Sequence, residues 1–193
     1  MFKRTRIYFY VLKNIVLLRI NGVVFSNCIR IRGPFTLDMR QNTKMHIGEN
    51  FALTSSLMLN PLGRNLKSMF RLDKGAKVTI GNNVGMSCVT LWASKAIIIH
   101  DNVKLGSGVM LIDSDMHSLN FEHRRNPLTD AINAKSKEIV IDNDAFIGTN
   151  SIITKGVKIG KRVIVAAGSV VVKSIPDDEI WGGNPAKFIK KND

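Results

Sequence analysis

A histidine closely follows two aspartates in the segment 112–117, which reads IDSDMH. A neutral imidazole, with an unperturbed pKa of about 6.5, can accept a proton near neutral pH. A carboxylate next to such a ring orients it and stabilises the charged form that appears when the proton is taken up. We therefore identify His117 as a candidate general base and expect Asp113 or Asp115 to orient its ring.

His117 also opens a stretch, residues 117–138, that breaks the regular pattern of the chain on both sides of it. A connection with a purely structural role is usually shorter, so an excursion of this length indicates a function. A run of three consecutive basic residues lies within it: His123, Arg124 and Arg125. They are candidate contacts to a phosphate or carboxylate group of a substrate, with ordinary solvated charge as the alternative.

The chain after this excursion repeats with a period of six. From residue 141 it reads IDNDAF, IGTNSI, ITKGVK, IGKRVI, VAAGSV and VVKSIP, so every block starts with Ile or Val and has a small or β-branched residue fifth. Neither the 3.6-residue period of a helix nor strand alternation produces this pattern. A chain that turns through the three flat sides of a triangular prism does. Each block then supplies one strand and a corner, with its first side chain inward.

The same phase recurs before the excursion, in blocks that start at Ile99, Leu105 and Leu111, and more loosely at Ile80 and Ile47. A coil of this kind is stable only when both of its ends are capped. We therefore expect one domain, 1–193, of the all-β class. Its expected parts are a cap at 1–25, a repeat coil at 26–176 with the excursion at 117–138, and a short tail at 177–193.

The first twenty residues suit a helix at a surface. Four apolar residues would share one helix face: Phe9, Leu12, Val16 and Ile20. A basic cluster would lie at the start of the helix: Lys3, Arg4 and Arg6. This face either covers the open end of the coil or lies in a membrane interface beside anionic lipid, and a targeting sequence is the third alternative. The longest uninterrupted apolar run is far shorter than the roughly 20 residues that span a bilayer.

The composition limits the choice of partners. The 193 residues are 45% hydrophobic and 22% charged, which is a globular composition, and two cysteines make a disulfide framework or a cysteine-based zinc site unexpected. Few cysteines and no secretory signal indicate the cytoplasm. The net charge of +13 lies mostly in residues 1–74, which hold thirteen basic and three acidic residues. No nucleic-acid-binding motif accompanies it, so an anionic membrane surface or a phosphate-bearing substrate is the expected partner.

With its repeats at 141–176, its IDSDMH segment and the ending WGGNPAK at 181–187, the sequence resembles the hexapeptide-repeat acyltransferases. The likeness is strongest to sugar O-acetyltransferases of the maltose, galactoside and nodulation-factor kind and to those that modify O-antigens or capsules. It implies a left-handed parallel β-helix. It also implies that acetyl-CoA is the donor, that a sugar or glycan is the acceptor and that no metal is needed.

The resemblance assigns His117 the removal of a proton from the acceptor hydroxyl, which then attacks the thioester of acetyl-CoA directly. It matches five residues to the donor site: Thr149, Ala167, Lys173, Lys187 and Lys190. Thr149 and the backbone at Ala167 correspond to contacts with the pantetheine arm, and Lys187 and Lys190 to residues that face the nucleotide phosphates. Lys173 matches the Lys of a T-K-D turn, but Val172 replaces the preceding threonine. His117 comes one residue later than in the galactoside-type enzymes, so upstream acceptor residues are not transferred.

The same resemblance implies a homotrimer with active sites between subunits, working in the cytoplasm or at the inner face of the cell membrane. Three other functions stay open: acylation of a sugar amine, a non-catalytic scaffold, and the zinc-dependent carbonic-anhydrase branch of the same fold. The last needs three histidines around one metal, for which His100, His117 and His123 are the candidates. We expect His46 and His100 to have no part in catalysis.

Overall fold

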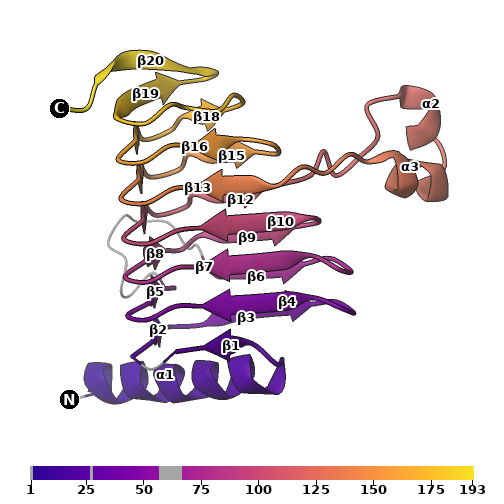
Figure 1. Ribbon diagram of the computed structural model, residues 1–193. Helices are drawn as coiled ribbons and strands as arrows, with labels where there is room; N and C mark the ends of the chain where they lie inside the picture. The colour runs from indigo at the N-terminus through magenta and orange to yellow at the C-terminus, as the bar shows by residue number, and fades with distance from the viewer. Residues whose placement is uncertain (1, 27, 57–66) are drawn as a thin grey trace.

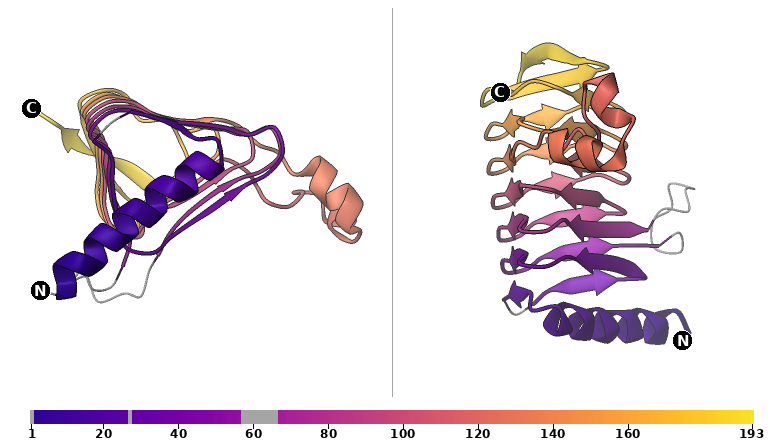
Figure 2. Two further views of the ribbon diagram at one scale, coloured as in Figure 1. Left: turned by 90° about the horizontal axis from the view of Figure 1, so that it is seen from below. Right: turned by 90° about the vertical axis from the view of Figure 1, so that its right-hand side faces the viewer.

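The computed structural model describes residues 2–26, 28–56 and 67–193, with side chains from residue 7 onward. The chain winds into a tall stack of coils that runs from helix α1 (Phe2–Ile20) at one end to a hairpin at the other (Figure 1). Seen along its axis, the stack has a triangular outline with one sheet on each side (Figure 2). The repeats predict this prism of parallel strands, and the structure confirms it.

Each side of the prism is one sheet. Sheet A contains β1 (Val24–Phe25), β4 (Lys44–Ile47), β7 (Lys77–Ile80), β10 (Ala96–Ile99), β13 (Ile139–Ile141) and β16 (Lys158–Ile159). Sheet B contains β2 (Arg30–Arg32), β5 (Ala52–Thr54), β8 (Gly85–Ser87), β11 (Lys104–Leu105), β14 (Phe146–Ile147), β17 (Ile164–Val165), β19 (Glu179–Gly183) and β20 (Ala186–Lys191). Sheet C contains β3 (Phe35–Met39), β6 (Ser68–Leu72), β9 (Thr90–Ala93), β12 (Met110–Ile112), β15 (Ile152–Thr154) and β18 (Val170–Val171).

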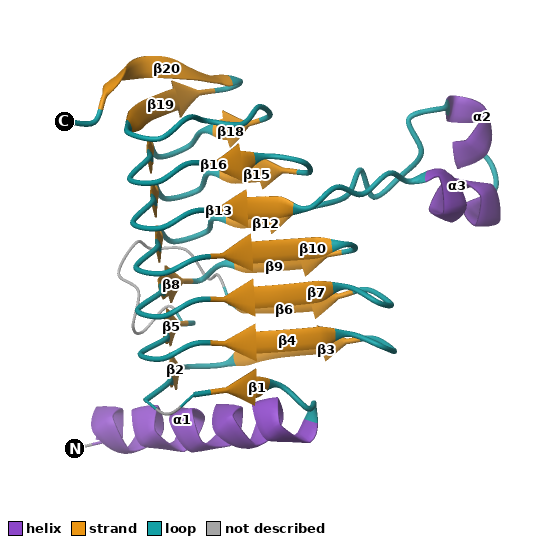
Figure 3. Cartoon of the chain, in the orientation of Figure 1, coloured by secondary structure: helices purple, strands orange, loops and turns teal. Residues whose placement is uncertain are grey.

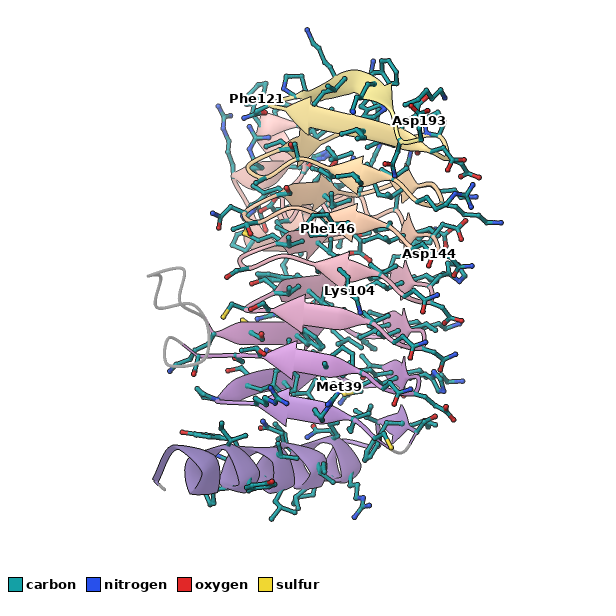
Figure 4. The ribbon with its side chains drawn as sticks, turned by 90° about the vertical axis from the view of Figure 1, so that its left-hand side faces the viewer. Met39, Lys104, Phe121, Asp144, Phe146 and Asp193 are labelled. Atoms are coloured by element: carbon teal, nitrogen blue, oxygen red, sulfur yellow. The ribbon has the colours of Figure 1, made fainter. Side chains whose placement is uncertain are left out.

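The first residue of each repeat block points into the prism, as expected. Six successive blocks begin on six successive strands, and their first side chains are 0–1% exposed: Ile141, Ile147, Ile153, Ile159, Val165 and Val171. The alternate side chains point outward. Lys104 and Phe146, which are register neighbours on β11 and β14, lie side by side on the outer surface of sheet B (Figure 4). One apolar column inside each sheet therefore holds the coils in register.

Polar side chains and glycines shape the edges between sheets. Along the edge between sheets A and B, Asn50, Asn83 and Asn102 have φ values of 54°, 57° and 62°. Their amides form a ladder, in which Asn50 donates to Asn83 and Asn83 donates to Asn102, each at 3.1 Å. Asparagine tolerates this left-handed backbone better than most residues. Along the edge between sheets B and C, a Cβ atom on Gly148 would lie 2.5 Å from the backbone nitrogen of Ala167, so only glycine fits there.

One long insertion leaves the stack without disturbing it. After β12 the chain departs at Asp113 and returns at Glu138, just before β13. We call residues 113–138 the arm. Although the arm lies between them, Ile99 on β10 still pairs with Ile141 on β13. The arm therefore extends the expected excursion by four residues toward the N-terminus.

Two short helices lie at the tip of the arm, α2 (Phe121–Arg124) and α3 (Pro127–Asn133) (Figure 3). Each begins after an asparagine whose side chain accepts a backbone N–H two residues on, Asn120 for α2 and Asn126 for α3. Asparagine at this position satisfies an N–H group that the helix itself leaves unpaired. Pro127, which lacks an N–H group, occupies the first turn of α3. The sequence around the arm tip therefore determines where both helices start.

Helix α1 caps the first coil, as one of the interpretations of the sequence predicts, but with the opposite face from the expected one. It lies across the triangular end of the prism (Figure 2). Leu18 is fully buried, and Asn14, 1% exposed, donates from Nδ2 to the carbonyl oxygens of Ile31 and Gly33 at 3.1 and 3.0 Å. The four apolar residues expected to cover the coil are instead 52–79% exposed: Phe9, Leu12, Val16 and Ile20.

The expected C-terminal tail is a hairpin that closes the other end. Strand β19 adds to sheet B in parallel beside β17, and β20 folds back antiparallel on β19. Glu179 ties the two strands together through its ion pair with Lys191 Nζ at 2.8 Å, and it also accepts from Trp181 Nε1 on its own strand at 2.7 Å. The coil itself begins at β1, slightly before the expected boundary at residue 26. Within the described residues, no helix is long and apolar enough to cross a membrane.

The buried amide of the cap gives a test of this arrangement. Replacing Asn14 with Ala leaves two buried carbonyl oxygens without their donor, which costs about 1–3 kcal/mol of unfolding free energy. Thermal unfolding should therefore shift downward by several degrees. Lys13→Ala is the matched control, because Lys13 is the exposed neighbour on the same helix. Equal stability of the two variants would contradict the capping role of Asn14.

Candidate active site

The arm brings one carboxylate directly onto the ring of His117. Asp130 Oδ2, from α3, lies 2.6 Å from His117 Nδ1, and Asp130 Oδ1 accepts the backbone N–H of Ser118 at 2.7 Å. The carboxylate therefore holds both the ring and the backbone that follows it. The expected partners of the ring, Asp113 and Asp115, do not hold it, and Asp130 takes that place.

The protonation state of Asp130 follows from these contacts. The hydrogen bond from His117, together with the Ser118 N–H, lowers the pKa of the Asp130 carboxyl below its usual range. Asp130 is therefore ionised at neutral pH and accepts a hydrogen bond from Nδ1–H, so that in the neutral ring the lone pair is on Nε2. The His117 side chain is 70% exposed, and Nε2 has no partner among the described residues. This is the arrangement that a general base requires.

Asp113 has a structural role beneath the arm. It is fully buried, and its two oxygens accept the backbone N–H groups of Ser94, Lys95 and Ala96 at 2.6–2.8 Å. Burial raises the pKa of Asp113, and the three N–H donors oppose that shift. Because every donor comes from the preceding coil, this carboxylate fastens the base of the arm to the stack.

Asp115 also faces away from the ring and forms an ion pair with Lys155, 3.1 Å away on the next coil. The outgoing and returning segments of the arm are joined at its base. Ser114 and Ser136 form a β-bridge, and the N–H of Asp115 donates to the carbonyl of Lys135. The two aspartates predicted to act on the histidine therefore position the arm that carries it.

The three predicted acceptor contacts have partners inside the arm. Arg124 donates to the carbonyl of Ser118 at 2.6 Å, and His123 Nδ1 lies 3.2 Å from the hydroxyl of Ser118. The guanidinium of Arg125 lies over the ring of Phe121, 5.2 Å from its centre. These contacts hold the tip of the arm together, and the structure adds no acceptor role for them.

A cavity of about 280 Å³ lies at the base of the arm, and sequence reasoning missed it. Its lining includes Met116 and Ala131, the chain neighbours of His117 and Asp130. On the side of the prism, the ring of Trp92 lies 4.6 Å from the guanidinium carbon of Arg71, and both line the cavity. The cavity is therefore close to the candidate base and offers a flat ring, a cation and hydroxyl groups.

Asp73 organises this lining. It accepts from Trp92 Nε1 at 2.9 Å, from the Ser94 hydroxyl at 2.7 Å and from Arg71 Nε at 3.2 Å. Burial alone would raise the pKa of Asp73, but these three hydrogen bonds together lower it. Asp73 is therefore an anion at neutral pH that fixes its three neighbours in place.

Two of the predicted donor-site residues lie on successive coils at a single edge of the prism. Thr149 follows β14 and Ala167 follows β17, at the edge where sheet B turns into sheet C, and the N–H of Gly168 donates to the Thr149 carbonyl at 2.8 Å. We call this the donor edge. Ala167 is exposed, so its small side chain leaves the surface of the edge open.

The hairpin brings one of the predicted lysines toward the donor edge. Lys187 pairs with Gly182, and Gly182 packs against Ala166, the neighbour of Ala167. Lys190 is further along β20, opposite Ile180. Both lysines are exposed. Lys173 follows β18 at the edge between sheets C and A, where the arm also leaves, so the structure separates it from the other donor residues.

The candidate base and the donor edge belong to different edges of one chain. The arm leaves between β12 of sheet C and β13 of sheet A, whereas Thr149 and Ala167 lie between sheets B and C. Seen along the axis, the arm projects outward from its corner, away from the body of the prism (Figure 2). A single chain thus presents the two halves of the predicted site without joining them.

The described residues contain no cluster of three or more His, Cys, Asp or Glu side chains that could hold a metal ion. His100 follows β10 at the edge between sheets A and B, far along the coil from the arm with His117 and His123. A larger hollow of about 500 Å³ lies on sheet A near the end of α1, around His46. None of the predicted catalytic or donor residues lines it.

Comparison with known proteins agrees with the repeats. A family described as bacterial transferase hexapeptide (six repeats) matches residues 138–173. The chain is also 30% identical over 175 residues to WbbJ of Escherichia coli (strain K12), named as an O-acetyl transferase of lipopolysaccharide biosynthesis. That match covers 88% of this chain and 82% of WbbJ.

Solved structures share the architecture. A maltose O-acetyltransferase from Clostridium difficile 630 has a TM-score of 0.58 at 25% identity, over 82% of this chain and 71% of that one. AntD, an N-acyltransferase from Bacillus cereus solved with dTDP and 3-hydroxybutyryl-CoA, has a TM-score of 0.67 at 18% identity, over 91% and 87% of the two chains, and shows the fold alone. The fold is thus the expected left-handed parallel β-helix, and the chain belongs to the hexapeptide-repeat acetyltransferases.

Proposed function

We propose that the protein transfers the acetyl group of acetyl-CoA to a hydroxyl group of a sugar in a cell-surface glycan or its precursor. The observation that carries this is the pair of His117 and ionised Asp130, which leaves an exposed basic nitrogen on the arm. Two similar proteins, one named for O-acetyl transfer in lipopolysaccharide biosynthesis and one named as a maltose O-acetyltransferase, support the sugar hydroxyl as acceptor.

In the proposed reaction, Nε2 of His117 removes the proton of the sugar hydroxyl as its oxygen attacks the thioester carbonyl. The carbon–sulfur bond breaks, the proton passes from the ring to the departing thiolate, and an acetyl ester and free coenzyme A result. Asp130 stabilises the imidazolium that exists between these steps and keeps the ring in the reactive tautomer. The carbonyl is attacked directly, so no side chain becomes acetylated.

The cavity at the base of the arm is the proposed acceptor site. Its volume is close to the lower end of small-molecule sites and suits one sugar ring. The Trp92 ring offers a flat apolar surface, and Arg71 offers donors to hydroxyl groups or to an acidic substituent. Asp73 would hold this lining rigid before the acceptor arrives.

The donor edge is the proposed site for the pantetheine arm of acetyl-CoA, with Lys187 and Lys190 toward its phosphates. An exposed alanine on a rigid coil leaves room for an extended chain to lie along the edge. Because base and donor edge are separate within one chain, we further propose a homotrimer in which the arm of one subunit reaches the donor edge of the next. Apolar residues exposed on the arm would be covered in such an assembly: Leu119, Phe121, Leu128 and Ile132.

The first test of the reaction concerns the ring and its carboxylate. His117→Ala should lower kcat by roughly 10²–10⁴-fold, because a general base contributes about that much. Asp130→Asn should lower kcat at least about tenfold, because the amide no longer fixes the tautomer. The rate is followed by the mass that a sugar acceptor gains with acetyl-CoA.

Glu122→Gln serves as the matched control for Asp130→Asn, since Glu122 is an exposed carboxylate on the same arm. Its kcat should stay within a fewfold of the parent. Mild alkali should release the acetyl group from the product, as it does from an ester; an alkali-stable product would be an amide and would overturn the hydroxyl acceptor. A His117→Ala variant with more than half the parental turnover would overturn the base.

The donor edge is tested by introducing a large side chain at Ala167. Ala167→Trp should weaken binding of coenzyme A at least tenfold, because the indole would fill the space proposed for the pantetheine arm. Lys161→Trp places the same bulk on the exposed edge between sheets A and B and should leave the affinity unchanged. Calorimetry on the folded variants measures both, and unchanged affinity of the Ala167 variant would remove the proposed path.

The shared site is tested by mixing two inactive chains. When His117→Ala and Ala167→Trp subunits are co-expressed in equal amounts, about one site in four should regain activity, because a cyclic trimer pairs each arm with the next subunit's donor edge. Purification through a different tag on each chain isolates the hybrids. If base and donor of one subunit served the same reaction, the hybrids would be as inactive as the separate variants.

A further inference from the structure

Helix α1 has two apolar faces, and only one of them is used by the fold. The inner face covers the first coil through Leu18 and Asn14. The outer face carries a row of apolar side chains that are 61%, 66%, 52% and 79% exposed, which we call the outer stripe: Phe9, Leu12, Val16 and Ile20. Spacings of three, four and four residues align them along one side of the helix.

Basic residues flank the outer stripe. At 3.6 residues per turn, Lys13 lies roughly 60° to one side of the centre of the stripe and Arg19 roughly 60° to the other. Both are exposed. The helix sequence contains five basic residues and no acidic one, and residues 1–74 as a whole hold thirteen basic and three acidic residues. The end of the prism that α1 covers therefore combines exposed apolar side chains with positive charge.

The helix lies flat across the end of the prism, so that its whole outer side faces away from the coils (Figures 1 and 2). A helix that lies in the plane of a membrane interface buries an apolar stripe among the acyl chains and places flanking Lys and Arg beside the lipid phosphates. The geometry of α1 matches this requirement. The catalytic arm is on another face of the stack, where a flat surface against the end would not cover it.

A second copy of the chain fits the outer stripe less well. A large aromatic side chain buries up to roughly 250 Å². If each of the four stripe residues contributed that area, scaled by its exposed fraction, the total would still be less than the roughly 800 Å² that each partner buries in a standard interface. Two such ends would also bring like charges together, which disfavours association. An anionic bilayer supplies the opposite charge. We propose that α1 docks the end of the prism on an anionic membrane surface.

This docking uses no residue of the reaction, so its measurement is independent of the acetyl-transfer assays. The full chain should sediment with phosphatidylcholine vesicles that contain about 30% phosphatidylglycerol at low salt, and much less with pure phosphatidylcholine vesicles. Raising the salt to about 0.5 M should weaken the binding, because the Debye length then falls well below 10 Å. Equal binding to both kinds of vesicle, or no binding to the anionic ones at low salt, overturns the proposal.

The outer stripe is tested without changing charge. Leu12→Ser/Val16→Ser should lower vesicle binding at least tenfold. Phe188→Ser/Ile189→Ser is the matched control, because these residues are 50% and 57% exposed on the hairpin at the opposite end of the prism, and it should bind within twofold of the parent. Circular dichroism and thermal unfolding check that both variants stay folded. Equal loss in the two variants overturns the assignment to α1.

The flanking charges are tested separately. Lys13→Gln/Arg19→Gln should weaken binding to anionic vesicles roughly 10- to 30-fold, since each basic residue at such a surface contributes severalfold. The control Lys158→Gln/Lys161→Gln removes the same charge from exposed positions near the other end and should have little effect. Size-exclusion chromatography with light scattering gives the last check. If the stripe variant breaks a higher oligomer instead of losing vesicle binding, a second copy covers the stripe and the membrane proposal is wrong.

Discussion

Close contact between the backbones of successive coils is the constraint on which the rest of this structure depends. Neighbouring parallel strands lie about 4.8 Å apart, and the chain keeps that spacing while it turns three times in each coil. At Gly148 the spacing leaves no room for a side chain, because a Cβ there would lie 2.5 Å from the nitrogen of Ala167 on the next coil. Backbone N–H groups at the edges donate to carbonyl groups of the neighbouring coil, and the buried columns of Ile and Val fix the register between coils.

A stack under this constraint accepts an insertion only if the chain leaves and returns at one edge. The arm does so between β12 and β13, and Asp113 secures it by accepting three N–H groups of the coil below. The two halves of the site consequently differ in kind. The His117–Asp130 pair is built within the arm, whereas the donor edge with Thr149 and Ala167 is a property of the stacked coils. Their separation follows from the winding of the chain, and a symmetric neighbour is the simplest way to join them.

The sequence predicts the periodic part of this structure well because burial repeats with the period of the blocks. The inward direction of Ile141 and its five counterparts, the arm and the two caps all follow from that pattern. Asp130 does not, since thirteen residues and the turn between α2 and α3 separate it from His117, and the nearer Asp113 and Asp115 have the residue type that the base needs. The local signal for it is the sequence Asn126-Pro127, which predicts the start of a helix and so puts Asp130 in the first turn of that helix. The orientation of α1 was also undetermined, because a helix with apolar residues on both faces has no preferred inner side in the sequence alone.

The two ends of the prism show why the outer side of α1 calls for an explanation of its own. Capping elements of repeat folds normally present a polar outer face, because that face must stay in water. The C-terminal hairpin conforms in part, with Lys187, Lys190 and Lys191 exposed. Helix α1 does not conform: Leu18, Asn14 and the partly buried Ile15 face the first coil, yet its outer side still carries the stripe of four exposed apolar residues. Closure of the coil would be equally well served by polar residues at those four positions. The stripe is therefore a feature that the stability of the prism does not require.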